Sequence, residues 1–411
     1  MAKMTESSAE SVHFGIRADM SLSAVIAGFV TVAVAYSGPM LVVLQAAESA
    51  GLSSDLTQSW VWAISIVSGI TCVVLSLVSR QPVVVAWSVP GAALLITALG
   101  NYGYSDAVGA YVMAALMSLF LSLTGIFGKL LAMVPSQIMA AVLAGVLLPF
   151  VLNVALAVVQ SPLVAGGLVA AFVLGRRILP RYAVLLALVV GAGLSVSAGQ
   201  VSLPSLEFDL GGPVWTVPTF SFQAFLGIAV PITVVTMAGQ NGPGLAVMHS
   251  YGYKVNDRIV LGGASLAWLL TAPIGAHGIN LAAIAAGICA GREAHSDIRR
   301  RYVAAVFAGL FFILFGLFST MAVALFSSLP TEMMAALAGV AIVGALQSSL
   351  SDSLSGFNCA PEAVEAGLIT LVVTSSGISP WGIVSPFWGL LAGSVSYLVL
   401  RTYVRKPPSE Q

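Results

Sequence analysis

Four short polar clusters interrupt otherwise apolar stretches, and their side chains could bind an anion through hydrogen bonds. Two of them combine polar groups with Gly, and the first also contains Pro: Ser88-Val89-Pro90-Gly91 and Ala276-His277-Gly278-Ile279-Asn280. The other two, Tyr36-Ser37 and Gln240-Asn241, each stand directly before a Gly-Pro pair. None of the clusters pairs a nucleophile with a base, forms a phosphate-binding loop or gathers metal ligands. We therefore expect no enzyme activity, no metal and no cofactor.

The composition places these clusters in a membrane. Of the 411 residues, 58% are hydrophobic and 8% are charged, whereas a soluble globular protein carries about 25% charged residues. The formal net charge is zero, so nothing in the charge balance favours nucleic acid. The three cysteines lie in or beside apolar segments, and we interpret them as small buried hydrophobic residues: Cys72, Cys289 and Cys359.

The apolar runs predict an all-α polytopic membrane protein with fourteen transmembrane segments. The first seven segments are 22–45, 57–78, 82–100, 105–127, 134–158, 161–175 and 181–199. The second seven are 222–248, 257–272, 274–290, 302–327, 332–350, 362–377 and 382–401. Twelve spans remain an alternative, because omitting a pair of weak spans preserves the orientation of the others.

The charges predict the orientation of these segments. If the N-terminus lies inside, all sixteen Lys and Arg residues fall on the inner side, as the positive-inside rule requires. The stretch 200–221, with Glu207 and Asp209, then becomes an extracytoplasmic loop. We therefore expect a multi-pass protein with cytoplasmic N- and C-termini.

Seven spans per half would make the halves an inverted repeat, an arrangement common in secondary transporters. The segment Tyr36–Val43 shares the pattern polar-polar-Gly-Pro-x-Leu-x-Val with the segment Gln240–Val247. Spans 3 and 10 also align when Val89-Pro90-Gly91 is set against Ala276-His277-Gly278. Chance similarity is the alternative, because Gly, Ala, Val and Leu dominate both halves.

Spans 3 and 10 are predicted to be broken, each with a short extended stretch before a half-helix. Ser favours the cap position and Pro the first turn of a helix, so a half-helix should begin near Ser88 after the stretch 81–87. The Gly- and Pro-containing segment 272–280 should likewise precede a helix that begins at Leu281. Two such N-termini would offer free N–H groups and partial positive charge to an anion. Ordinary membrane-helix kinks are the alternative.

The predicted binding residues come from these breaks and from the Gly-Pro sites. His277 is the only His predicted well inside the bilayer, so it is also the candidate for proton coupling. Structural roles are the alternative, since Asn and Gln hydrogen-bond helices together in membranes. The full set comprises Tyr36, Ser37, Ser88, Pro90, Gly91, Gln240, Asn241, His277, Gly278 and Asn280.

Four motifs together have a specific pattern: Val85–Leu95, Val234–Gly244, Ala272–Ile284 and Ala290–His295. Through these motifs the chain resembles the benzoate/proton symporter (BenE) family over nearly its whole length. Two residues beside the predicted site depart from the family pattern, which leaves the exact aromatic acid open. Val89 stands where Thr is usual, and Gly239 stands where Ser is usual.

The resemblance implies uptake of benzoate, or a similar aromatic carboxylate, with a proton across the inner membrane of a bacterium. It also implies the uracil-permease-like fold, in which a core domain moves against a gate domain, and a homodimer with contacts through the gate. The core domain would comprise 20–128 and 222–328, and the gate domain 133–200 and 330–403. Tyr36, Trp87 and Phe387 are candidates for contact with the substrate ring. A nucleobase or inorganic-anion carrier, or a channel of the same fold, is the alternative.

Overall fold

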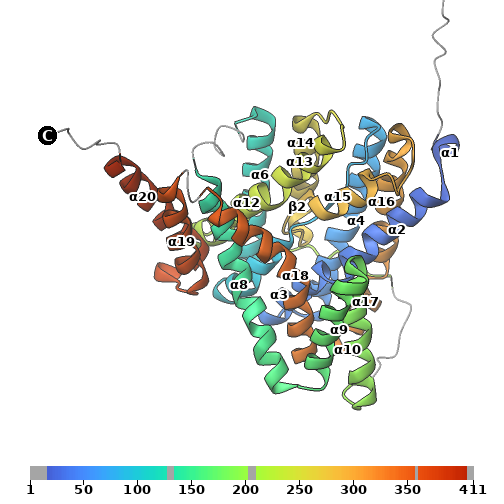
Figure 1. Ribbon diagram of the computed structural model, residues 1–411, viewed down its shortest axis with the longest axis horizontal. Helices are drawn as coiled ribbons and strands as arrows, with labels where there is room; N and C mark the ends of the chain where they lie inside the picture. Colours follow the sequence, from blue (N-terminus) through green and yellow to red (C-terminus); the bar gives the residue numbers. More distant parts are fainter. Residues whose placement is uncertain (1–15, 127–133, 202–209, 357–359, 405–411) are drawn as a thin grey trace, which may run out of the picture.

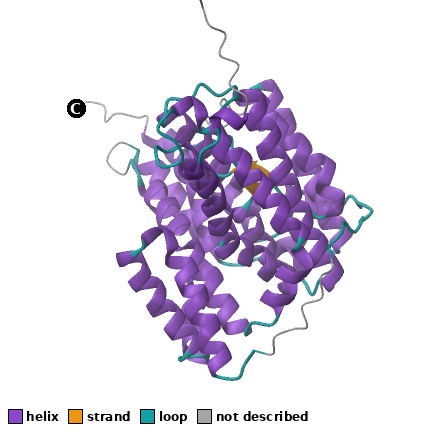
Figure 2. Cartoon of the chain, turned by 90° about the vertical axis from the view of Figure 1, so that its right-hand side faces the viewer, coloured by secondary structure: helices purple, strands orange, loops and turns teal. Residues whose placement is uncertain are grey.

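The computed structural model describes residues 16–126, 134–201, 210–356 and 360–404, and helices dominate it (Figures 1 and 2). Cys359, Glu207 and Asp209 lie outside the described residues, as do the predicted segment and domain ends at 127, 128 and 133. Within the described ranges, seven helices are long and apolar enough to cross a membrane: Leu22–Ser49, Ser54–Ser79, Tyr104–Thr124, Ser136–Gln160, Phe222–Ser250, Ile298–Leu317 and Thr331–Leu354.

The first half of the chain contains two helices that meet at Gly38, a broken segment and five further long helices among its described residues. Its elements are α1 Ile16–Asp19, α2 Leu22–Ser37, α3 Pro39–Ser49, α4 Ser54–Ser79, β1 Val85–Trp87, α5 Val89–Ala98, η1 Leu99–Asn101, α6 Tyr104–Thr124, α8 Ser136–Gln160, α9 Val164–Ile178, η2 Pro180–Tyr182 and α10 Ala183–Ser197.

The second half follows a similar order, with two π-helical turns in its first long helix. Its elements are α11 Phe222–Ala224, η3 Phe225–Ala229, α12 Val230–Thr236, η4 Met237–Asn241, α13 Gly242–Ser250, α14 Asp257–Thr271, η5 Ala272–Ile274, β2 Ile279–Leu281, α15 Ala283–Ala290, η6 Ile298–Arg300, α16 Tyr302–Leu317, α17 Ser319–Ser327, α18 Thr331–Leu354, α19 Pro361–Ser375, η7 Pro380–Gly382 and α20 Ser385–Val404.

Each predicted apolar segment therefore contains helix, while the number of membrane crossings stays a prediction.

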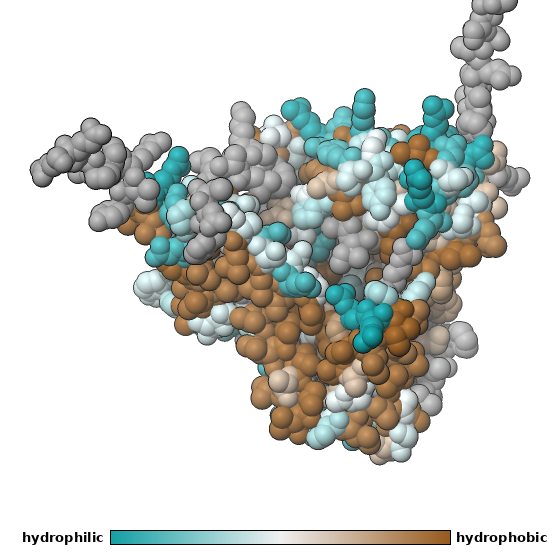
Figure 3. Space-filling view, in the orientation of Figure 1, coloured by the Kyte–Doolittle hydropathy of each residue, from teal (hydrophilic) through white to brown (hydrophobic). Residues whose placement is uncertain are grey.

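The outer surface fits a lipid environment. Figure 3 shows apolar side chains over much of one face, with hydrophilic residues along its upper edge. Large apolar residues of α8 and α9 are exposed, among them Leu152, Leu156, Val159, Val173 and Ile178. Exposing such an apolar surface to water is unfavourable, whereas exposing it to lipid is not.

The two broken segments meet in a short antiparallel pair of strands. In β1 and β2, Val85 pairs with Leu281, Ala86 with Asn280 and Trp87 with Ile279. The predicted extended stretches are therefore confirmed. Backbone polar groups at membrane depth need partners, and this ladder supplies them.

Two details of the predicted break in span 10 were wrong. The helix begins at Ala283 and not at Leu281, because Leu281 pairs with Val85 as the last residue of β2. The alignment of spans 3 and 10 was also misplaced. By its position in the break, Val89, the first residue of α5, corresponds to Ala283 and not to Ala276. The shared glycines misled the alignment, because Gly91 lies inside a helix and Gly278 precedes a strand.

Candidate functional site

The ladder of β1 and β2 brings the starts of two half-helices together. It continues beyond the strands, because Ser88 N–H donates to the Gly278 carbonyl at 3.1 Å and Ala282 N–H donates to the Val84 carbonyl at 3.0 Å. Since the strands are antiparallel, α5 and α15 leave from opposite ends of the ladder. The cap positions Ser88 and Ala282 are separated by the four residue steps from Val84 to Ser88, which is about 13 Å along the strands at ~3.3 Å per residue.

The start of α5 is capped as predicted. Ser88 Oγ accepts a hydrogen bond from Gly91 N–H at 3.1 Å and also bonds the Thr236 hydroxyl at 2.8 Å. Pro90 lies in the first turn, where its missing N–H leaves no helical bond unmade. Thr236 was not predicted, although it stands one helical turn before Gln240 in a motif that the sequence singled out.

The start of α15 has no such cap. Its cap position is Ala282, which offers no side-chain acceptor to the first N–H groups of the helix. The first N–H groups of a helix have no partner within the helix itself. The two half-helices therefore differ, because the start of α5 has a side-chain cap and the start of α15 has none.

His277 joins three parts of the site. Its Nδ1 accepts a hydrogen bond from Trp60 Nε1–H at 2.8 Å, and its Nε2 lies 2.9 Å from the Ser88 carbonyl. Because Trp60 can only donate, Nδ1 is unprotonated and Nε2–H donates to the carbonyl. The imidazole has no exposed surface. Trp60 was missed, since no sequence pattern relates α4 to a residue that far along the chain.

Two asparagines hold the backbone around the ladder. Asn241 Oδ1 accepts from Leu281 N–H at 3.0 Å, while its Nδ2 has only Met237 Sδ at 3.4 Å. The Asn280 amide, oriented to satisfy both of its ends, accepts from Ser88 N–H at 3.1 Å and donates to the Leu281 carbonyl at 3.0 Å. Both side chains are buried. Asn241 thus keeps a weakly satisfied donor near α15.

Gln240 and Asn241 close the π-helical turn η4. Such turns occur frequently at functional sites, because they turn side chains out of the regular helical register. Gln240 is half-buried, and its amide has no hydrogen-bond partner among the described residues. A free amide beside Asn241 fits a ligand-binding role.

The glycines of the site allow close contact. A Cβ atom at Gly278 would lie 2.8 Å from Ser88 Cβ, and one at Gly91 would lie 2.9 Å from Ser88 Oγ. Both distances are shorter than a van der Waals contact, so larger residues would push the cap away from its partners. Ser88, Gly91 and Gly278 are therefore packed as one unit.

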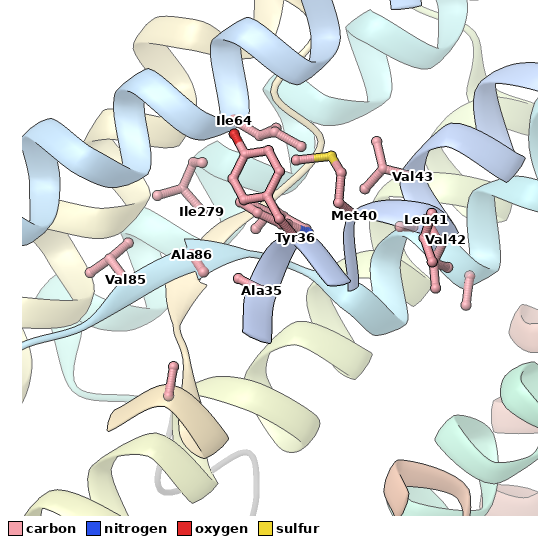
Figure 4. Close-up of a cluster of buried hydrophobic side chains, with 14 of the residues drawn as sticks. Ala35, Tyr36, Met40, Leu41, Val42, Val43, Ile64, Val85, Ala86 and Ile279 are labelled. Atoms are coloured by element: carbon pink, nitrogen blue, oxygen red, sulfur yellow. The ribbon is translucent and has the colours of Figure 1, made fainter. Parts of the chain in front are cut away.

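Tyr36 contacts α4 and the end of β1. Its hydroxyl donates to Ser65 Oγ at 2.5 Å, and its ring meets Trp87 edge-to-face at 5.7 Å. Figure 4 shows Tyr36 within a cluster of buried apolar side chains that includes Met40 and Ile64. Ser37 is the last residue of α2, and its side chain is outside the described part of the structure. Phe387 packs on Trp388 within α20.

Four polar side chains of the site are buried in this structure. Ser88, His277 and Asn280 have no exposed surface, and Asn241 is 2% exposed. Two surface hollows lie elsewhere. One is lined by His249 and the segment 254–258, and the other by apolar residues of α8, α9 and α18. The start of α15 is less enclosed, because Ala282 at its cap position is half-buried.

The chain has the fold of several solved structures, two of which are a bicarbonate transporter and an anion transporter by their titles. The chain superposes on the overall structure of SLC26A9 with a TM-score of 0.65 and 13% identity, covering 96% of this chain and 67% of that one. A second structure of that protein, from mouse, is described as an anion transporter in the inward-facing state. The transmembrane domain of the cyanobacterial bicarbonate transporter BicA superposes with a TM-score of 0.61 and 14% identity. The match covers 91% of this chain and 98% of that domain. At this identity the likeness establishes the fold.

Sequence relatives are closer. The benzoate membrane transport protein of Acinetobacter baylyi is 38% identical over 385 residues, which is 94% of this chain and 97% of that protein. Inner membrane protein YdcO of Escherichia coli is 35% identical over 377 residues, or 91% and 95% of the two chains. The family model for benzoate membrane transport proteins, BenE, matches residues 18–399. The chain is therefore a membrane transport protein that belongs to the BenE benzoate membrane transport family.

Proposed function

We propose that this protein is a secondary active transporter that imports benzoate, or a similar aromatic carboxylate, together with a proton. The observation that carries the proposal is the uncapped start of α15, which lies one short ladder away from the start of α5. The N–H groups and partial positive charge of a helix start favour a carboxylate without a buried cation. Family membership supports benzoate as that carboxylate.

The proposed binding residues divide into two groups by their contacts. One group holds the backbone of the site, because its polar side chains are already bonded or its small size allows close packing: Ser88, Pro90, Gly91, His277, Gly278 and Asn280. The other group has donors to offer, namely the Gln240 amide and Asn241 Nδ2. Tyr36 and Ser37 belong to the proposed set through the break at Gly38.

His277 is the proposed proton-coupling residue. A second proton would go to Nδ1, which now accepts from Trp60. Protonation would therefore break that hydrogen bond and free the imidazole from α4. Coupling of this kind would link proton binding to the geometry of the Ser88 turn, because Nε2 holds the Ser88 carbonyl.

Transport would proceed by alternating access of the core domain, 20–128 and 222–328, against the gate domain, 133–200 and 330–403. Packing supports this division, because α16 packs mainly on α4 and α2, whereas α8 packs mainly on α18 and α19. The boundary is tight, and a Cβ at Gly38 would lie 2.8 Å from Ala341 Cβ. A boundary of small residues allows two rigid bodies to approach closely.

The proposal includes fourteen spans as an inverted repeat, a bacterial inner-membrane location and cytoplasmic termini. The antiparallel pairing of β1 with β2 and the two Gly-Pro helix starts, at Pro39 and at Gly242-Pro243, support the repeat. A homodimer through the gate domain is part of the same proposal. The exposed apolar surface of α8 and α9 is compatible with it.

An inorganic-anion or nucleobase carrier, or a channel, is the second candidate. The titles of the solved structures with this fold, an anion transporter and a bicarbonate transporter, favour the inorganic anion. Competition separates the candidates. Excess unlabelled substituted benzoates should reduce uptake of radiolabelled benzoate into proteoliposomes, whereas uracil, sulfate and bicarbonate should not. Inhibition by sulfate or bicarbonate alone would favour the second candidate.

A further inference from the structure

Trp87 carries a buried hydrogen-bond donor without an acceptor. It ends β1 and directly precedes Ser88, and its side chain is 2% exposed. Its Nε1–H has no hydrogen-bond partner in the described part of the chain. Buried indole N–H groups usually find an acceptor, because leaving a desolvated donor unpaired is unfavourable. This donor therefore calls for an explanation.

The other fully buried tryptophans have partners close to the same site. Trp60 Nε1–H donates to His277 Nδ1 at 2.8 Å, and Trp268 Nε1–H donates to the Ala276 carbonyl at 3.0 Å. Both acceptors lie on the segment before β2. The unpaired state of Trp87 is thus a property of its own position in the break.

The indole cannot turn to another acceptor. Its nitrogen only donates, in a direction that the ring plane sets. The ring is held edge-to-face by Tyr36 and by Phe312, each with a centroid separation of 5.7 Å. The hydroxyl groups that also lack partners, such as those of Ser68 and Tyr111, can rotate about their C–O bonds. The Trp87 donor is therefore fixed in place and unsatisfied among the described residues.

We propose that Trp87 Nε1–H donates a hydrogen bond to the carboxylate of the aromatic acid when the site is occupied. A carboxylate only accepts hydrogen bonds, so it complements a group that only donates. Trp87 adjoins Ser88 along the chain and contacts Tyr36, two residues of the proposed site. The inference rests on the proposed function, since it needs a carboxylate ligand.

The indole N–H signals test this directly. Protein labelled with ¹⁵N at the indole nitrogens of its seven tryptophans is placed in nanodiscs, and the Trp87 signal is the one absent from Trp87→Phe. Saturating benzoate should move that signal downfield, as a new hydrogen bond to an anion requires. An unmoved Trp87 signal in protein that binds benzoate would overturn the inference.

Transport kinetics give a second readout. Trp87→Phe keeps an aromatic ring and removes the N–H, so the KM for benzoate should rise about tenfold to a hundredfold, the range of a charge-assisted hydrogen bond. The matched control is Trp388→Phe, which removes an indole N–H that donates to the Ile383 carbonyl at 2.9 Å on α20. Its KM should stay unchanged. An unchanged KM in Trp87→Phe would refute the role of Trp87 and leave the proposed function intact. Absence of benzoate uptake by the natural sequence would refute the proposed function itself.

Discussion

Trp60 Nε1–H donates to Nδ1 of His277 across 2.8 Å, and this one bond sets the tautomer of the imidazole. With Nδ1 as the acceptor, Nε2–H points to the carbonyl of Ser88 at 2.9 Å. His277 therefore ties α4 to the turn that begins α5. Any proton that His277 takes up must be accommodated at the atom that Trp60 occupies.

Replacing Trp60 by Phe tests the role of this bond. The variant removes the N–H donor that competes with a proton for Nδ1, so His277 should bind a proton more easily. The pH at which uptake falls to half should rise by roughly half to one pH unit, since one hydrogen bond is worth about 1 kcal/mol and one pH unit about 1.4 kcal/mol. Initial uptake rates across a pH series measure it.

The matched control for this experiment is His277→Gln, which keeps hydrogen-bonding groups and cannot titrate. Its uptake should lose the pH dependence of the natural protein. If His277→Gln transports with an unchanged pH profile, His277 does not carry the proton, and the shift expected for Trp60→Phe disappears with it.

Ser88→Ala removes the cap of α5. Gly91 N–H and the Thr236 hydroxyl both lose their partner, so the protein should lose about 0.5–2 kcal/mol of stability. Thermal unfolding in detergent measures the change. Thr236→Val, which keeps the cap and breaks only the bond between hydroxyls, should cost less. Equal losses in the two variants would show that the bond to Gly91 contributes nothing.

Gly38→Ala should obstruct the boundary between the proposed domains. The added methyl group would lie 2.8 Å from Ala341 Cβ and 3.2 Å from Val184 Cγ1, so the helices have to separate. We expect at least a tenfold loss of uptake. The double variant with Ala341→Gly removes the opposing methyl group and should recover much of it. A double variant no better than Gly38→Ala would mean that the contact with Ala341 is unimportant.

Asp19 anchors the start of α2 and should be sensitive to loss of its charge. It is 2% exposed, accepts from the Tyr302 hydroxyl at 2.8 Å and lies 3.5 Å from Arg300 Nε. Asp19→Asn should therefore lower the free energy of unfolding by about 1–3 kcal/mol. Asp257→Asn is the control, because that carboxylate is half exposed and its pair with His249 should contribute little. Similar effects in both variants would argue against a buried anchor.

Local signals made part of the site predictable. Ser88 followed by Pro90 indicates a helix start on its own, because the cap and the first turn depend on neighbouring residues. The predicted start of α15, in contrast, was wrong. Leu281 is held in the strand by Val85 and by Asn241, which lie far away in the sequence. Trp60 and Thr236 were missed for the same reason. Their partners, His277 and Ser88, become neighbours only through the fold.

Benzoate uptake into proteoliposomes under an imposed proton gradient tests the central claim most directly. The protein, reconstituted with an acidic exterior at pH values where benzoate is ionised, should take up radiolabelled benzoate saturably. Uptake should exceed that of protein-free liposomes at the same gradient, which corrects for passive entry of benzoic acid. A protonophore should remove the excess. Benzoate entry no faster than in protein-free liposomes, or uptake indifferent to the proton gradient, would contradict proton-coupled benzoate transport.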